Sequence, residues 1–430
     1  MRPSKVLLVV HGLPPFELSG TPLIAQQYGE ELARRGVDVG IVYAVTESDA
    51  GPLGAHRIDG EAFWRFGTTA TLWRWLDWCS RDVAGISGRD GAALRPFDDL
   101  LNRFRPDLVH VIDSVNLPSE WPLLARARGI PVVRSVWNTE DICGNGEPLV
   151  ATEPPRLCPP PLRPADCASH YSFPLLDGHI VGGDELCALL KAKRRFTELL
   201  FDRVYDRVIF PTESFRDFFT ATLPIGPERA VVIEPGIDTA WARSITHEDR
   251  PGERNLAFLG TFVPRKGVGL LRDAFLHPSL RARSDYVLSV YGNGDPAPIL
   301  ELQQHNPRVQ YLGAYTPADL PSILATASVG LSPSWFETYH RVTREYLAAG
   351  VPVIGTTAFG IPDAVEHGVN GLLVEQGDVG GFVGAILRVL DDPTVLRALR
   401  EGASRTRLRS VPEEVDDVVA VYCELLNDQG

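Results

Sequence analysis

The chain has 430 residues, which is too long for one ordinary hydrophobic core, so we expect two domains. Apolar residues make up 44% and charged residues 23%, as in globular proteins. The formal charge of −13 argues against general nucleic-acid binding, which requires a basic face. The sequence has no apolar run of the roughly 18 residues that a spanning helix needs. Six cysteines without paired spacing favour a reducing, cytoplasmic setting.

The first half of the chain alternates short β-branched runs with longer helical patterns. Most of these runs are apolar on both sides, which is typical of strands buried in a parallel sheet with helices on both faces. They occupy residues 6–10, 39–43, 107–112, 131–136, 207–212 and 230–235.

A polar stretch from Arg243 to Arg254 then interrupts the pattern and is interpreted as the linker between domains. The alternation restarts with runs at residues 255–260, 285–292, 309–313, 329–334, 351–356 and 371–375. We therefore predict doubly wound α/β domains at 1–242 and 255–411, with a C-terminal helix (412–430) that packs back on the first. Two such sheets facing each other make a cleft, and ligands bind beyond the carboxyl ends of the strands.

Two regions lack the alternation. Residues 63–78 carry four tryptophans and two arginines, and we interpret them as a packed helix; an acceptor platform and a peripheral membrane contact are the alternatives. The Pro-rich segment 143–167 contains Cys143, Cys158 and Cys167, which lack the C-x2-C pairs of confident zinc sites. Buried or loop thiols are the simpler expectation, and no metal is expected.

The strongest constellation of polar residues lies between residues 332 and 374. Glu337 follows a strand, and Glu345 lies in a helix that ends at Gly350. Eight residues of helix rise about 12 Å, so these carboxylates would bracket an elongated ligand instead of sharing a small group. The segment from Thr338 to Arg341 is predicted to open the helix and to offer free N–H groups to a phosphate. Solvated helix charges are the alternative for both glutamates.

This stretch resembles the E-x7-E signature of the retaining GT-B glycosyltransferases of family 4. Other segments also resemble motifs of this family: GTFVPRKG (260–267), GNG (292–294), GVPVI (350–354), NGLLV (370–374), VIFPTESFRDFF (208–219) and IEPGID (233–238). The resemblance implies a GT-B fold: two Rossmann-like domains that face each other across a cleft. It places the acceptor on the first domain and a nucleoside diphosphate sugar on the second.

The resemblance also implies residue roles. Glu345 would bind the donor ribose, Glu337 would lie near the donor sugar and phosphates, and Lys266 would bind the diphosphate. Lys is a sensible point charge for phosphate, in a chain whose basic residues are mostly Arg. Further donor contacts are implied for Gly20, Gly260, Thr261, Thr338, Tyr339, His340 and Arg341.

The chain departs from the family pattern at several positions. Thr261 stands where the family has Arg, and Arg265 is the expected substitute. Ser19 replaces the first of two glycines before the first helix. Trp137, followed by Asn138, stands where the family commonly has His near the reacting centre. Retaining transfer by a front-face route does not need a side-chain base, because the departing phosphate can take the acceptor proton.

Acceptor-side contacts are predicted for Trp137, Asn138 and His110, although a core residue with satisfied hydrogen bonds is the better interpretation of His110. The function predicted is retaining sugar transfer without a metal, to a small molecule, a glycan or a lipid-linked sugar. A catalytically lapsed sugar-nucleotide-binding protein and a GT-B isomerase or phosphorylase are the alternatives. A NAD enzyme is disfavoured because no G-x-G-x-x-G follows the first strand. The donor sugar, its base, the acceptor and the oligomeric state are left open.

Overall fold

The computed structural model describes residues 2–14, 20–46, 56–58, 61–68, 95–113, 117, 119–144, 146–150, 152, 154–174, 180–247 and 252–428. The chain forms two compact units. The first comprises Met1–Glu147, Pro159–Pro235 and Val411–Gly430, and the second comprises Pro148–Cys158 and Gly236–Ser410. The boundary between them falls at residues 235 and 236, earlier than the polar stretch expected to be the linker.

The sheet of the first unit is almost entirely parallel. In spatial order its strands are β12 (Ala230–Val232), β11 (Arg207–Phe210), β6 (Val132–Ser135), β5 (Leu108–Val111), β1 (Lys5–Val10), β2 (Asp38–Thr46), β4 (Glu61–Thr68) and β3 (His56–Ile58). Only β3 pairs antiparallel in this sheet. The chain adds strands on one side of β1 and then on the other, so the strand order reverses between β1 and β5. That point is where ligands bind in open α/β sheets.

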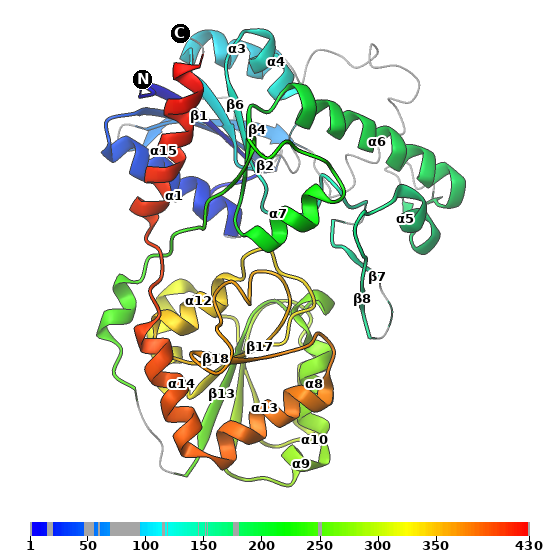
Figure 1. Cartoon of the computed structure of the whole chain (residues 1–430), viewed down its shortest axis with the longest axis vertical. Helices are drawn as coiled ribbons and strands as arrows, with labels where there is room; N and C mark the ends of the chain where they lie inside the picture. The colour runs from blue at the N-terminus through cyan, green and yellow to red at the C-terminus, as the bar shows by residue number, and fades with distance from the viewer. Residues whose placement is uncertain are drawn as a thin grey trace. The chain divides into compact units, whose positions relative to one another are not determined.

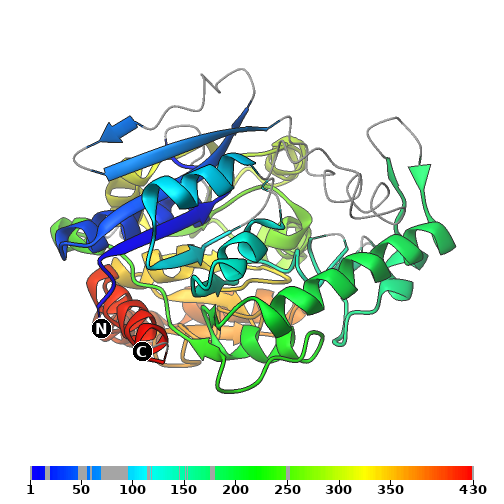
Figure 2. The same cartoon turned by 90° about the horizontal axis from the view of Figure 1, so that it is seen from above.

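The C-terminal helix belongs to this first unit. Helix α15 (Val411–Asn427) lies beside α1 (Gly20–Arg34), as Figures 1 and 2 show in red and blue. Its buried side chains, Val415 and Tyr422 among them, share a core with strands β1 and β5. The other helices described are α3 (Arg95–Phe104), α4 (Trp121–Ala127), α5 (Pro164–His170), α6 (Gly183–Arg203) and α7 (Glu213–Thr220).

The sheet of the second unit is wholly parallel. Its strands lie in the order β15 (Val309–Gly313), β14 (Tyr286–Tyr291), β13 (Arg254–Leu259), β16 (Val329–Ser332), β17 (Val353–Thr356) and β18 (Gly371–Val374). Here the strand order reverses between β13 and β16, which defines a second ligand-binding point at their carboxyl ends.

Helices cover both faces of this second sheet (Figure 1). One face packs against α8 (Val268–Leu276), α10 (Ala297–His305) and α13 (Val379–Asp391). The other packs against α11 (Leu320–Thr326) and α12 (Arg341–Ala348). The remaining elements are η1 (Ala240–Ser244), η2 (Pro264–Lys266), α9 (Pro278–Arg281), η3 (Pro317–Asp319) and α14 (Pro393–Arg405).

The strands expected from the sequence are all present, but the interpretation of residues 63–78 is wrong where it can be compared. Residues 61–68 form strand β4 and not a helix. Trp73, Trp75 and Trp78 lie outside the described residues. The structure adds two short strand pairs that periodicity could not indicate, β7 (Leu149–Val150) with β8 (Arg156–Leu157) and β9 (Phe173–Pro174) with β10 (Ile180–Val181). Within the described ranges, no helix is long and apolar enough to cross a membrane.

Candidate functional site

Two loops meet at the reversal point of the second sheet. One follows β13 and contains η2, and the other follows β16. The backbone N–H of Trp335 donates a hydrogen bond of 2.8 Å to the carbonyl oxygen of Arg265, which holds the two loops together. This contact brings Glu337 close to Arg265 and Lys266, although 71 residues separate Lys266 from Glu337 in sequence.

Glu337 receives two basic side chains. The ammonium of Lys266 donates a hydrogen bond of 2.7 Å to its Oε1, and Nη1 of Arg265 lies 3.5 Å from its Oε2. Only 4% of Glu337 is exposed, whereas the side chains of Lys266 and Arg265 keep 17% and 29% exposure. Two cations thus surround one carboxylate, and the group retains positive charge that faces outward.

Burial and these cations have opposite effects on the pKa of Glu337. Burial favours the protonated acid, but the attraction to Lys266, His340 and Arg265 prevails and lowers its pKa to about 2. His340 lies 3.7 Å away, and burial lowers its pKa to about 3. The imidazole is therefore neutral at pH 7, so Lys266 and Arg265 supply the charge that keeps Glu337 ionised.

The approach of the two loops depends on Gly267, which has a φ of 75°. A Cβ at this position would lie 1.8 Å from the carbonyl oxygen of Pro333. Only glycine combines the left-handed backbone with so close a neighbour. The close packing of the two loops therefore explains why position 267 is a glycine.

The helix that contains Glu345 begins later than the sequence suggested. Helix α12 starts at Arg341, and His340 precedes it in the left-handed region with a φ of 54°. Residues 338–340 are a turn and not the first turn of a helix. The prediction that Thr338 opens the helix is therefore wrong, and the 12 Å rise estimated from eight helical residues does not apply.

Glu345 lies on α12 and is 7% exposed. Nε of Arg341 donates a hydrogen bond of 2.9 Å to its Oε1. Burial raises the pKa of Glu345 despite this partner, the opposite of the shift at Glu337. The fold therefore stabilises the ionised form of Glu337, whereas burial destabilises the ionised form of Glu345.

Arg344 is a residue of this region that the sequence did not single out. It is 1% exposed, and its Nη1 donates to the carbonyl oxygens of Tyr339 and Gly360, the latter at 3.0 Å. Its guanidinium carbon lies 3.7 Å from the centre of the Tyr339 ring. Arg344 thus fixes the turn that precedes α12. Nothing in its sequence position distinguished it from a solvated helix charge.

The other residues predicted to contact the donor lie at element ends. Gly260 directly follows β13, and Thr261 is exposed in the next position. Gly20 is the first residue of α1 in the first unit; a Cβ there would meet no atom within 4 Å. Space alone therefore does not require glycine at position 20, and Ser19 lies outside the described residues.

The reversal point of the first sheet gathers polar residues of which the sequence analysis predicted only Asn138. His11 follows β1, Asp113 follows β5, and their side chains lie 3.5 Å apart. Asn138, after β6, donates from Nδ2 to Asp113 Oδ2 at 3.1 Å. Burial, Asp113 and Asp141 raise the pKa of Glu140 to about 7. Their shared position after β1, β5 and β6 was the available signal.

Of the three acceptor-side predictions, the one for His110 is wrong. His110 is 0% exposed, with Nδ1 2.6 Å from the hydroxyl of Tyr422 and Nε2 2.8 Å from Oγ of Ser135. Burial lowers its pKa to about 3, so it is a neutral core residue that holds α15. Trp137 is half-buried against the same core, whereas Asn138 lies in the polar group with Asp113.

The cysteines of the Pro-rich segment form no disulfide within the part of the chain that the structure describes. Cys143 is buried, and Cys158 and Cys167 are partly exposed. Among the residues that the structure describes, no group of three or more His, Cys, Asp or Glu side chains could hold a metal ion.

Comparison with known families decides the classification. The model of "Glycosyltransferase Family 4" matches residues 19–241, more than half of the chain. The chain belongs to glycosyltransferase family 4. The model of "Glycosyl transferases group 1" matches residues 253–392 of this family 4 protein, so the two matches fall on the two α/β arrays.

Curated relatives agree with this classification. A glycogen synthase of Mycobacterium tuberculosis is 30% identical over 214 residues, covering 48% of this family 4 chain and 51% of the relative. A D-inositol 3-phosphate glycosyltransferase of Catenulispora acidiphila is 28% identical over 244 residues, covering 50% and 57%. The chain thus spans about half the length of the curated relatives it matches.

Solved structures support the fold over the full length. Sucrose-phosphate synthase from Thermosynechococcus elongatus superposes with a TM-score of 0.67 at 17% identity, covering 99% of this chain and 98% of the other. Anabaena HepE in complex with UDP gives 0.63 at 14% identity, covering 98% and 100%. The family 4 chain has the GT-B fold.

Proposed function

We propose that this protein is a retaining glycosyltransferase that uses a nucleoside diphosphate sugar as its donor. The observation that carries the proposal is the convergence of Lys266 and Arg265 on Glu337 at the reversal point of the second sheet. Two partly exposed cations at the carboxyl ends of parallel strands suit a diphosphate. Glu337 and Glu345 supply the acceptor atoms that hydroxyl groups of a ribose and a sugar require.

The chemistry expected at this site is stabilisation of a leaving diphosphate. As the bond between the sugar and the diphosphate breaks, negative charge grows on the phosphate oxygens. Lys266 and Arg265 are positioned in advance to neutralise it, which is the usual source of the largest rate effect. In a front-face route, the leaving phosphate accepts the proton of the attacking hydroxyl. We propose that no divalent metal is needed, and EDTA should leave the turnover unchanged.

The acceptor is proposed to contact the first unit near Asp113, Asn138 and Glu140. These groups accept hydrogen bonds at the carboxyl ends of β5 and β6, and they suit hydroxyl groups of a small molecule or a glycan. The half-buried Trp137 stands beside them in sequence. We place the reaction in the cytoplasm as part of this proposal.

A thermal-shift panel of UDP-, GDP- and TDP-sugars tests the donor class. A ligand at a hundred times its dissociation constant stabilises by about 2.7 kcal/mol, which is readily measured. Turnover of the sugar that stabilises best is then followed, and the anomeric configuration of the product is read by NMR. Failure of every nucleotide sugar to stabilise the protein would contradict the proposal, as would inversion at the anomeric carbon. Stabilisation without turnover or donor hydrolysis would favour a lapsed binding protein.

A further inference from the structure

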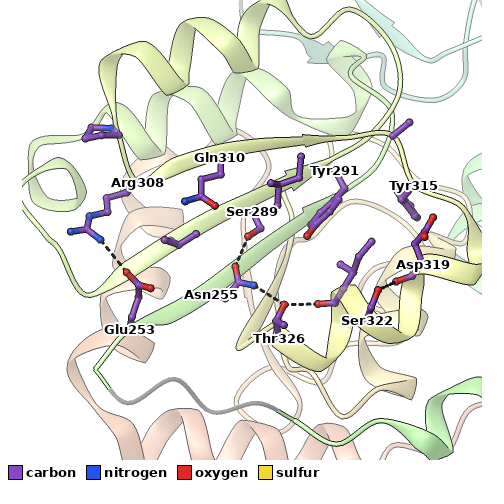
Figure 3. Close-up of a pocket in the computed structure, with 15 residues that line it drawn as sticks. Glu253, Asn255, Ser289, Tyr291, Arg308, Gln310, Tyr315, Asp319, Ser322 and Thr326 are labelled. Carbon is purple, nitrogen blue, oxygen red and sulfur yellow. Dashed lines mark hydrogen bonds and ion pairs between the residues drawn. The ribbon is translucent and has the colours of Figure 1, made fainter.

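A polar hollow of about 590 Å³ lies on one face of the second sheet. Figure 3 shows Asn255, Ser289 and Gln310, which come from the neighbouring strands β13, β14 and β15. Ser289 and Gln310 are direct neighbours in the register of the parallel pair. Ser322 and Thr326 come from α11 on the same face. The volume is within the ~300–1,000 Å³ range of small-molecule sites.

Part of this wall is fixed by its own hydrogen bonds. Oγ of Ser289 donates to Oδ1 of Asn255 at 2.8 Å, and Nδ2 of Asn255 donates to Oγ1 of Thr326 at 3.1 Å. In contrast, the hydroxyls of Tyr291 and Tyr315 and the side-chain amide of Gln310 make no hydrogen bond to the residues that the structure describes. The hollow therefore offers donors and acceptors on a rigid floor.

The charged groups of the lining already have partners within the chain. Nη1 of Arg308 lies 3.1 Å from Oε1 of Glu253. The carboxylate of Asp319 accepts from the backbone N–H and the hydroxyl of Thr316 at 2.8 and 2.7 Å. Burial raises the pKa values of Tyr291 and Tyr315, so both remain neutral hydroxyl groups. The lining therefore has no spare positive charge for an anionic ligand.

The rim also contains an apolar patch. Leu312 on β15 lines the hollow and is 45% exposed, one of the few large apolar side chains that the structure describes in such an environment. A sugar ring has hydroxyl groups at its edge and an apolar face of C–H groups. It matches a lining that combines neutral hydrogen-bonding groups, two phenols and an exposed leucine.

We propose that this hollow binds a neutral sugar, of one or two rings, separately from the nucleotide. The floor of Asn255 and Ser289, the amide of Gln310 and the hydroxyl of Tyr291 hold its hydroxyl groups. Tyr315, at one end of the hollow, is close enough to Glu345 to interact with it electrostatically. The lining of the hollow includes neither Lys266 nor Arg265, so it is distinct from the proposed phosphate-binding group.

The test uses the full chain and a panel of neutral mono- and disaccharides, with binding measured by saturation-transfer NMR and calorimetry. Gln310→Lys places a long charged side chain across the exposed strand and should weaken binding at least tenfold. Tyr291→Phe, which removes one hydroxyl, should weaken it severalfold. Gln304→Lys is the matched control, because Gln304 is exposed on α10, which packs on the other face of the sheet, and it should change nothing.

Saturating UDP, GDP or TDP should leave sugar binding in place. Displacement of the sugar by a nucleotide would overturn the proposal, because the hollow would then be part of the donor site. The proposal also fails if no sugar of the panel binds, or if Gln310→Lys binds as well as the wild type. Donor turnover by Gln310→Lys is measured alongside. If this variant still turns over the donor, any loss of sugar binding is separate from the proposed transferase function.

Discussion

The ammonium of Lys266 and the carboxylate of Glu337 form a hydrogen-bonded ion pair of 2.7 Å, although 71 residues separate them in sequence. The contact joins the loops after β13 and β16, the strands between which the sheet order reverses. Because Nη1 of Arg265 lies 3.5 Å from Oε2 of the same carboxylate, removal of one cation does not leave Glu337 without a partner.

Replacement of Lys266 by alanine should weaken nucleoside diphosphate binding. Hydrogen bonds to charged groups contribute about 1.5–3 kcal/mol, so the dissociation constant should rise roughly 10- to 100-fold. Calorimetry with the nucleotide chosen by the thermal-shift panel measures the change. Lys191→Ala is the control, since Lys191 is exposed on α6 of the first unit. An unchanged affinity of Lys266→Ala would remove the lysine from the donor site.

Glutamine at the two glutamates should affect stability in opposite directions. Glu337→Gln removes a carboxylate that the fold stabilises in its ionised form, and should lower the free energy of unfolding by about 3 kcal/mol at pH 7. Glu345→Gln removes a carboxylate that burial penalises, so stability should be unchanged or higher. Both variants should lose donor turnover. Urea unfolding and donor hydrolysis measure the two effects, and equal stability losses would contradict this assignment.

The pH dependence of unfolding should distinguish the same pair. The pKa of Glu337 is lowered to about 2 in the fold, so its contribution is present above its ordinary value of 4.5 and is lost as the pH falls towards 2. The pKa of Glu345 is raised, so its contribution is present below 4.5 and is lost as the pH rises through the folded value. Acid unfolding of Glu337→Gln should therefore have the shallower slope between pH 4.5 and 2.

A methyl group at Gly267 should separate the two loops. Its Cβ would lie 1.8 Å from a carbonyl oxygen, and its φ of 75° is unfavourable for alanine. Gly267→Ala should cost about 2 kcal/mol or more and should reduce nucleotide binding. Gly269→Ala, two residues later in α8, meets no atom within 4 Å and should stabilise by up to about 1 kcal/mol. Equal effects of the two substitutions would exclude loop packing as the reason for Gly267.

Glu140 should control the pH profile of sugar transfer. Burial and the neighbouring carboxylates Asp113 and Asp141 raise its pKa to about 7, while Lys193 and His11 oppose that shift. The carboxyl is then protonated below neutrality and ionised above it. Glu140→Gln imitates the protonated form, so acceptor-dependent transfer should lose its rise between roughly pH 6 and 8. Donor hydrolysis without acceptor should keep the wild-type profile; a parallel change in both would assign Glu140 to stability.

The strands of both sheets other than β3 and β4 were predictable, because buried parallel strands give a local signal. The same holds for Lys266 in the loop after β13, Glu337 after β16 and Glu345 in a helix. The start of α12 was not predictable. The left-handed backbone of His340 and the buried Arg344 that holds the turn depend on contacts with Gly360, which no local pattern encodes. The acceptor-side prediction for His110 was wrong for a related reason. Its hydrogen-bond partners, Ser135 and Tyr422, are 25 and 312 residues away in sequence.

Of the polar group in the first unit, only Asn138 was predicted from the sequence. His11, Asp113 and Asn138 each follow a strand, but nothing local indicates that β1, β5 and β6 are neighbours in the sheet. Strand order is a property of the whole fold. The resemblance indicated Trp137 and Asn138 and did not extend to the carboxylates of Asp113 and Glu140.

The return of α15 to the first unit has a consequence for biosynthesis. Tyr422 and Val415 fill the same core as Val6 and Leu8, at the opposite end of the chain. Domains made of continuous sequence can complete their folding as they emerge from the ribosome. Here the sheet of the first unit must wait, with part of its apolar face exposed, until residues 411–427 have been translated. A nascent chain stalled before residue 411 would therefore hold a finished second unit and an unfinished first one.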